Sequence, residues 1–267
     1  MKGMDYSWHR PGGAAIAAAG FEFVVRYVPY PGDGGKGLEA PELADLRANG
    51  LAVCLVWETT AGRALDGYEA GRFDATMSHT SAARLGFPAD RPIYFAVDFD
   101  AQPTQYAAID AYLRGCADVI GIDRVGVYGS FDVVRHCDQF GTARWLWQTY
   151  AWSGGRVYPA NDLYQYLNGQ TLNGGAVDYN DTSRSDYGQW PAEEDNMADP
   201  RVDEILKFIG EADMKAWLAK QNVPLIQAFA SEQTARGEAT NAINAHIDHH
   251  PGGAIGDHTH IPGGVAP

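Results

Sequence analysis

The sequence predicts an α/β protein of the (β/α)₈ barrel class, incomplete in its last helices and followed by a C-terminal helical extension. Short apolar stretches typical of strands alternate with helical stretches through residues 1–190, and this alternation favours parallel strands joined by crossover helices. Eight strands can be counted, the number needed to close such a barrel. No Gly-x-Gly-x-x-Gly or P-loop motif follows a strand, which argues against an open nucleotide-binding sheet.

The expected elements follow from local pattern and from punctuation by glycine and proline. Glycines at 20, 50 and 86 are expected to end helices. The last two strands lack convincing helices between them, hence the incomplete barrel. The expected strands are 4–8, 21–28, 51–57, 93–98, 125–128, 145–149, 163–166 and 177–180, and the expected helices are 11–20, 41–49, 68–85, 104–120 and 131–140.

The fourth expected strand ends in two acids. Alternation places one set of its residues on a single face, and the apolar remainder on the face that packs against helices. The first set is Tyr94, Ala96, Asp98 and Asp100. Two carboxylates about 6–7 Å apart along a strand suit glycoside hydrolysis, in which one acid donates a proton and another stabilises positive charge. Alternatively, an Asp-x-Asp pair binds a cation or caps the following helix.

In a barrel of this class the active site gathers at the C-terminal ends of the strands. Polar and aromatic residues occupy those positions on every expected strand. They are Asp5, Arg26, Tyr27, Trp57, Glu58, Asp98, Asp100, Tyr128, Gln148, Gln165, Asp178 and Asn180. Several have simpler interpretations: Asp5 as a helix cap, Asp178 and Asn180 as turn residues, Arg26 as the partner of an acid, and tryptophans such as Trp57 as packing residues.

The charge restricts the partners. A net charge of −14 and a pI near 4.8 argue against nucleic acid or an anionic membrane surface, because both require a basic surface. No basic-then-apolar leader opens the chain and no apolar run approaches the length of a membrane span. These features favour a phage-encoded lysin that reaches the wall from the host cytoplasm, or an extracellular or virion-associated protein.

Five segments resemble the glycoside-hydrolase-like domain of the DUF1906 family, which is related to the family 25 lysozymes. They are the N-terminal Asp5, "IYFAVDFD" at 93–100, "VGVYGS" at 125–130, "WLWQTYA" at 145–151 and "VDYN" at 177–180. The resemblance covers residues 3–190 and implies a peptidoglycan-directed N-acetylmuramidase that cleaves β-1,4 bonds between amino sugars without a cofactor. Similar domains occur in actinobacterial proteins and phage lysins.

The resemblance also implies roles for the site residues. The lysozyme motif is usually Asp-x-Glu, and Asp100, one methylene shorter, stands where the acid would be. Asp100 would protonate the glycosidic oxygen and Asp98 would stabilise the oxocarbenium-like centre or orient the N-acetyl group. Glu58 is the reserve acid. The remaining candidates would hold or tune the site: Asp5 and Asp178 as supporting carboxylates; Tyr128, Gln148, Asn180 and Arg26 as hydrogen-bonding groups; Tyr27 and Trp57 as flat faces for the sugar.

Two alternatives remain open. A non-catalytic carbohydrate-binding or structural phage or cell-wall protein could use the same barrel, and the Asp100 substitution favours it. A metal-dependent hydrolase is disfavoured because no histidine stands at an expected strand end. Residues 191–267 are expected to form an acidic helical extension with a flexible His/Gly/Pro-rich end, which could mediate oligomerisation or attachment to a particle.

Overall fold

The computed structural model describes residues 1–191 of the 267-residue chain, which form a closed eight-stranded barrel. Strands follow one another around the barrel in sequence order, so neighbours in the chain are neighbours in space. The strands are β1 (Lys2–Asp5), β2 (Phe23–Tyr27), β3 (Ala52–Trp57), β4 (Ile93–Ala96), β5 (Val125–Gly129), β6 (Trp145–Thr149), β7 (Leu163–Leu172) and β8 (Gly175–Asp181). The predicted barrel is confirmed.

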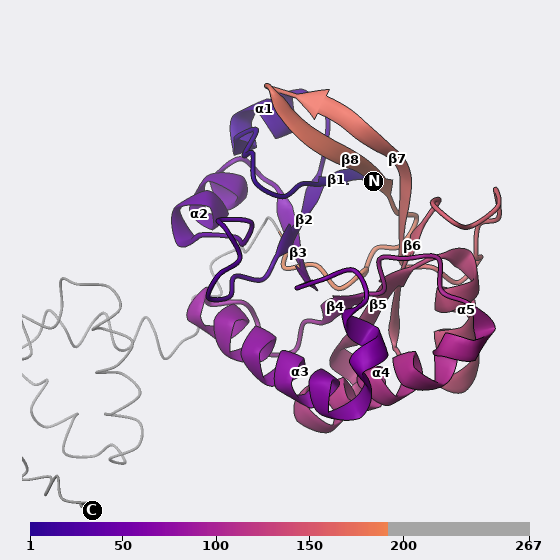
Figure 1. Ribbon diagram of the computed structural model, residues 1–267. Helices are drawn as coiled ribbons and strands as arrows, with labels where there is room; N and C mark the ends of the chain where they lie inside the picture. Colours follow the sequence, from indigo (N-terminus) through magenta and orange to yellow (C-terminus); the bar gives the residue numbers. More distant parts are fainter. Residues whose placement is uncertain (192–267) are drawn as a thin grey trace, which may run out of the picture. The chain divides into compact units, whose positions relative to one another are not determined.

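Helices cover the barrel on the side formed by its first six strands, as the view in Figure 1 shows. The α-helices are α1 (Gly13–Ala18), α2 (Ala40–Ala48), α3 (Gly67–Arg84), α4 (Tyr106–Ile120) and α5 (Phe131–Phe140). Ser130 caps α5, because its hydroxyl accepts a hydrogen bond from the Val133 amide, and Gly141 ends it in the left-handed conformation. The expected loss of the last helices is confirmed within residues 1–191.

The closing strand departs from an all-parallel (β/α)₈ barrel. Strands β1 to β7 pair in parallel, whereas β8 is antiparallel to both β7 and β1. The cause is a hairpin between β7 and β8, which turns at Asn173 and Gly174 with φ values of 47° and 82°. Such values suit a tight hairpin turn, for which Asn-Gly is a favoured pair. Because no helix intervenes, the chain reverses direction before closing the barrel.

Two apolar clusters follow the alternation of side chains along the strands. One fills the barrel interior and includes Phe23, Tyr94 and Trp147. The other lies between the strands and the helices and includes Ile93 and Phe95. The expected division into an inner and an outer face is therefore confirmed for residues 93–98, but it does not extend to Asp100. Both faces are buried, so the strands form a rigid support for the residues at their ends.

The expected acidic helical extension of residues 191–267, its His/Gly/Pro-rich end and its proposed attachment role lie outside the described residues, apart from residue 191. Within the described part, no helix is both long and apolar enough to cross a membrane.

Candidate active site

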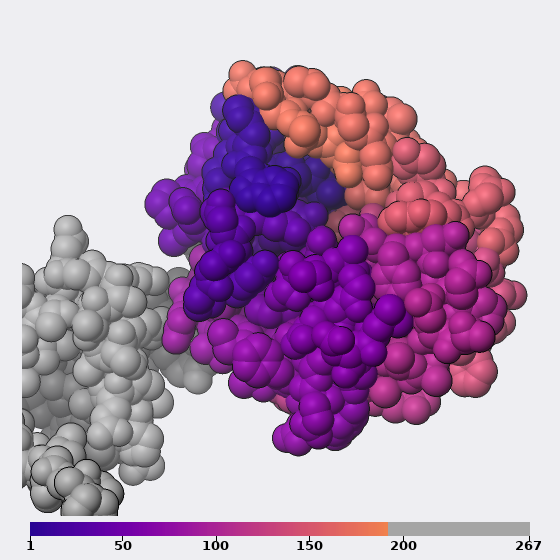
Figure 2. All heavy atoms as spheres, in the orientation of Figure 1, coloured from indigo at the N-terminus to yellow at the C-terminus, as the bar shows by residue number. Residues whose placement is uncertain are grey.

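A cavity of about 180 Å³ lies at the C-terminal ends of the parallel strands. Figure 2 shows the surface hollowed where the N-terminal segments, in indigo, meet the β7–β8 hairpin, in orange. All eight strands, and the segments that follow β3 and β4, contribute residues to its wall: Asp5, Tyr27, Val56, Glu58, Ala96, Asp98, Tyr128, Trp147, Gln165, Asn168 and Asp178. Four carboxylates from β1, β8 and the segments after β3 and β4 are thus brought to one space.

Asp5 is the most deeply buried of these acids, with 5% of its surface exposed. Its Oδ2 accepts hydrogen bonds from Gln165 Nε2 at 2.8 Å and from Asn180 Nδ2 at 2.7 Å. Burial and, to a smaller extent, the Asp178 carboxylate raise its pKa, the two amide donors and the charge of Arg26 only partly oppose these effects, and the net pKa is about 7. Asp5 therefore exchanges a proton near neutral pH.

Asp98 is half-buried and receives no hydrogen bond from another described side chain. Burial raises its pKa, and the Glu58 carboxylate adds to the shift while the Lys36 ammonium opposes it. Burial likewise raises the pKa of Asp178, although Gly169 N donates a hydrogen bond of 2.7 Å to its Oδ1. Burial thus raises the pKa of Asp5, Asp98 and Asp178, which is the direction that a general acid requires.

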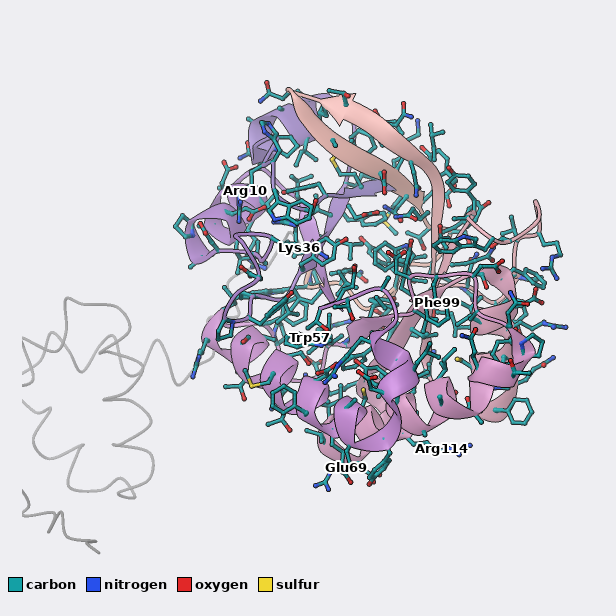
Figure 3. The ribbon with its side chains drawn as sticks, in the orientation of Figure 1. Arg10, Lys36, Trp57, Glu69, Phe99 and Arg114 are labelled. Carbon is teal, nitrogen blue, oxygen red and sulfur yellow. The ribbon has the colours of Figure 1, made fainter. Side chains whose placement is uncertain are left out.

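Lys36 supplies positive charge to this acidic space. Its Nζ lies 3.3 Å from Glu58 Oε1 and 3.8 Å from the centroid of the Tyr27 ring, and only 12% of its side chain is exposed. Figure 3 shows Lys36 at the edge of the opening enclosed by the strands. It is the one cationic side chain in contact with a cavity carboxylate within residues 1–191.

Neutral polar groups fix the floor of the cavity. Tyr128 O–H and Thr149 Oγ1 each donate a hydrogen bond of 2.8 Å to Gln165 Oε1, which leaves the amide nitrogen of Gln165 to face Asp5. Trp147 Nε1 donates a hydrogen bond of 2.8 Å to Asn180 Oδ1, which orients the Asn180 amide towards Asp5 in the same way. Asn180 thus positions Asp5 by a hydrogen bond and does not itself line the cavity.

Arg26 points away from the cavity, contrary to its expected role in substrate binding. It is fully buried and its Nε donates to Glu42 Oε1 at 2.7 Å. It also donates to the main-chain oxygens of Tyr6 and Lys36. The simpler interpretation, pairing with a neighbouring acid, is the one observed, because the next residue, Tyr27, takes the inward position on β2.

Two further expected contacts with the substrate are absent from the cavity wall. Trp57 belongs to the cluster between strands and helices, and its ring centroid lies 5.3 Å from that of Tyr30. Gln148 is buried and uses its amide to bind Arg156 O and the Tyr158 amide. Both residues follow an inward-facing neighbour on their strands, so the alternation turns them outward.

Asp100 also differs from its expected placement. Strand β4 ends at Ala96, and Asp100 lies in the segment beyond it, exposed and not among the cavity-lining residues. Its main-chain oxygen accepts a hydrogen bond from Gln102 Nε2 within this turn. The predicted strand through residue 98 is therefore too long, and the side chains of Asp98 and Asp100 do not share the cavity.

A second hollow, of about 340 Å³, lies between the loop after β2 and the end of α3. Its Asp33 accepts hydrogen bonds from the main-chain amides of Tyr30, Gly35 and Gly37, so this acid shapes the loop. The smaller cavity is the better candidate site, because it alone gathers acids from several strands. Among the described residues, no group of three or more His, Cys, Asp or Glu side chains is arranged to hold a metal ion.

Known proteins resemble this chain in sequence and structure. A family model described as "Rv2525c-like, glycoside hydrolase-like domain" matches residues 14–185. The protein named "Putative peptidoglycan hydrolase Rv2525c", of Mycobacterium tuberculosis, is 31% identical over 199 residues, covering 70% of this chain and 82% of its own length. The crystal structure of Tat-secreted Rv2525c with L-tartrate has a TM-score of 0.67 at 30% identity and covers 71% of this chain and 98% of that one. A Bacillus stearothermophilus protein shares the fold, with a TM-score of 0.52 at 19% identity, covering 69% and 96% of the two chains.

Proposed function

Because this chain belongs to the family of Rv2525c-like glycoside hydrolase-like domains, we propose that it hydrolyses glycosidic bonds of bacterial peptidoglycan in the cavity at the end of its barrel. One observation carries the proposal: four carboxylates from separate parts of the chain share a single space in which they contact only one cation of the described residues. A pair of carboxyl groups, one protonated and one ionised, is what hydrolysis of a glycosidic bond requires.

The proton donor in this proposal is Asp98, in place of the exposed Asp100. Asp98 lines the cavity and its pKa is raised, so its carboxyl group can hold a proton and pass it to the glycosidic oxygen as the C–O bond breaks. Ionised neighbours then stabilise the positive charge that develops on the sugar ring, and water adds to the anomeric carbon while a proton returns to the carboxylate.

Glu58 and Asp178 are the neighbours best suited to that second role. Glu58 forms an ion pair with Lys36, and Asp178 accepts a main-chain hydrogen bond from Gly169. Tyr27, Tyr128 and Trp147 provide the aromatic part of the wall. The finer proposal is a β-1,4 N-acetylmuramidase, which acts without a cofactor.

The test is release of reducing ends from purified bacterial cell walls, together with loss of turbidity. Asp98→Asn should lower the rate by about 100-fold or more, because removal of a general acid typically costs that much. Asp90→Asn, an exposed acid outside the cavity, is the matched control and should act like the wild type. An Asp98→Asn protein that retains full activity would refute Asp98 as the proton donor. Complete loss of activity in Asp100→Asn alone would instead support Asp100, the donor expected from the sequence.

A second candidate function is a glycan-binding protein that does not cleave its ligand. The exposure of Asp100 favours it, because the position that bears the acid in the lysozyme motif is outside the cavity. In that case the wild type would sediment with cell walls without releasing reducing ends.

The proposed place of action is the cell wall, outside the cytoplasm. This proposal is supported by the relative from M. tuberculosis, which is a Tat-secreted protein. Phage origin, oligomerisation and particle attachment through residues 191–267 stay predictions from the sequence.

A further inference from the structure

Trp8 is a large exposed aromatic side chain near Lys36, which in turn contacts an acid of the cavity. It follows β1 by three residues, and 62% of its surface is open to solvent. No other aromatic ring of the described residues stacks on it. Burying an exposed indole ring against an apolar surface is favourable, so a surface tryptophan next to a polar cavity is suited to the flat face of a sugar.

Hydrogen bonds from Arg10 hold the main chain at Trp8 in place. Arg10 Nη1 donates to Trp8 O at 3.2 Å, and Arg10 Nη2 donates to Gly35 O at 3.2 Å and Gly37 O at 2.8 Å. Arg10 is held in turn by Glu42, with Nε 2.7 Å from Oε2. One guanidinium group therefore joins the loop after β1 to the loop after β2 and holds the main chain at Trp8.

Lys36 lies between Trp8 and the cavity. The Lys36 ammonium lies 6.0 Å from the centroid of the Trp8 ring and 3.3 Å from Glu58 Oε1. Figure 3 shows Arg10 and Lys36 on the same side of the barrel opening. The indole is thus separated from a cavity carboxylate by one ammonium group, a span that adjoining units of a single glycan chain can bridge.

We propose that Trp8 is a sugar-stacking platform for the glycan unit next to the one held in the cavity, so that the ligand is an extended chain rather than a single sugar. The inference rests on the proposed function and deepens it by naming the substrate class. The cavity, of about 180 Å³, is the place for the unit that reacts, and Trp8 adds affinity for its neighbour. Because Arg10 holds the main chain at Trp8, less loop entropy is lost on binding.

The test is calorimetric binding of a soluble tetrasaccharide of alternating N-acetylglucosamine and N-acetylmuramic acid to the full chain carrying Asp98→Asn, which prevents turnover. Adding Trp8→Ala should weaken binding by about tenfold, and Trp8→Phe should recover most of the loss. Phe73→Ala is the matched control: Phe73 is 60% exposed on α3 and does not line the cavity, so its removal should leave the affinity unchanged.

The outcomes separate this inference from the function on which it rests. Equal affinity of the parent and the Trp8→Ala variant would overturn the platform and leave the proposed function intact. Failure of the parent to bind the tetrasaccharide would overturn both. An equal loss of affinity in the Phe73→Ala variant would show that exposed aromatic surface in general, rather than the indole of Trp8, supplies the affinity.

Discussion

Asp5 in the cavity and Asp74 on α3 are both almost fully buried, with 5% and 1% of their surfaces exposed, but their surroundings differ. Arg63 donates two hydrogen bonds to Asp74, from Nε and Nη2, each of 2.8 Å, and Tyr112 O–H donates a third of 2.8 Å. Asp5 has no cation in contact within the described residues and accepts only from the neutral amides of Gln165 and Asn180.

The difference has a consequence for the proton. The contacts of Asp74 with Arg63 and Tyr112 join α3 to α4 and to the segment that precedes α3. Asp5, whose pKa is raised from 3.8 to about 7, binds its proton more tightly in the folded state than in the unfolded state. Its ionisation therefore makes the folded state progressively less stable as the pH rises from about 4 to about 7.

This comparison distinguishes structural acids from candidate catalytic ones in the same barrel. Glu42, like Asp74, is paired with arginine, and the hydrogen bonds and charge of Arg26 and Arg10 outweigh burial and lower its pKa. In the cavity, burial and neighbouring acids raise the pKa of Asp5 and of Asp98. A protein gains no stability from such an arrangement, and that is typical of an active site.

The largest expected effect on folding is at Asp74. Asp74→Asn should lower the free energy of unfolding by about 2 kcal/mol or more, because it leaves the partly buried Arg63 guanidinium group without its buried partner. Asp66→Asn is the control: it removes the exposed partner of the same Arg63 and should cost less than about 1 kcal/mol. Urea unfolding measures both. Equal effects would contradict the view that Asp74 has a structural role distinct from that of a surface ion pair.

A smaller effect is expected at Lys36, whose ammonium group contacts Glu58 of the cavity and takes no part in the proposed proton transfer. Asp98 faces the carboxylates of Glu58 and Asp178 and the Lys36 ammonium, so Lys36→Met should raise the pKa of Asp98. Asp98 then keeps its proton to a higher pH, and the basic limb of the pH–activity profile moves upward. Lys36→Arg should preserve the profile, and Lys2→Met, at the start of β1 and exposed, should leave it unchanged. A downward shift in Lys36→Met would oppose the assignment of Asp98 as the acid.

The sequence predicted the barrel well but did not separate inward from outward side chains. Both faces of its strands are apolar and buried, so composition carries little information on which neighbour of a pair enters the cavity. Arg26 and Tyr27 are adjacent, and only Tyr27 is inward; Trp57 is outward, whereas Val56 and Glu58 line the cavity. Applying alternation from Glu58 would have excluded Trp57, whereas β2 contains no acid from which Arg26 could have been excluded.

Two other features had different signals in the sequence. The Asn173–Gly174 pair indicates a tight hairpin and could have predicted the reversal of β8. Lys36 had no such signal, because it stands in a glycine-rich loop and its position depends on hydrogen bonds from Arg10 and Arg26 to the main chain around it. Contacts between distant segments of this kind do not follow from local pattern.

The most direct test of the account is a carbon-13 NMR titration of the Asp5 carboxyl group in the full chain, with Asp5→Asn used to assign the signal. Because burial and the Asp178 carboxylate raise the pKa of Asp5, we expect a midpoint of about 7. A midpoint near the ordinary value of 3.8 would contradict the claim that the cavity keeps a proton on Asp5 near neutral pH, and with it the physical basis for glycoside hydrolysis at this site.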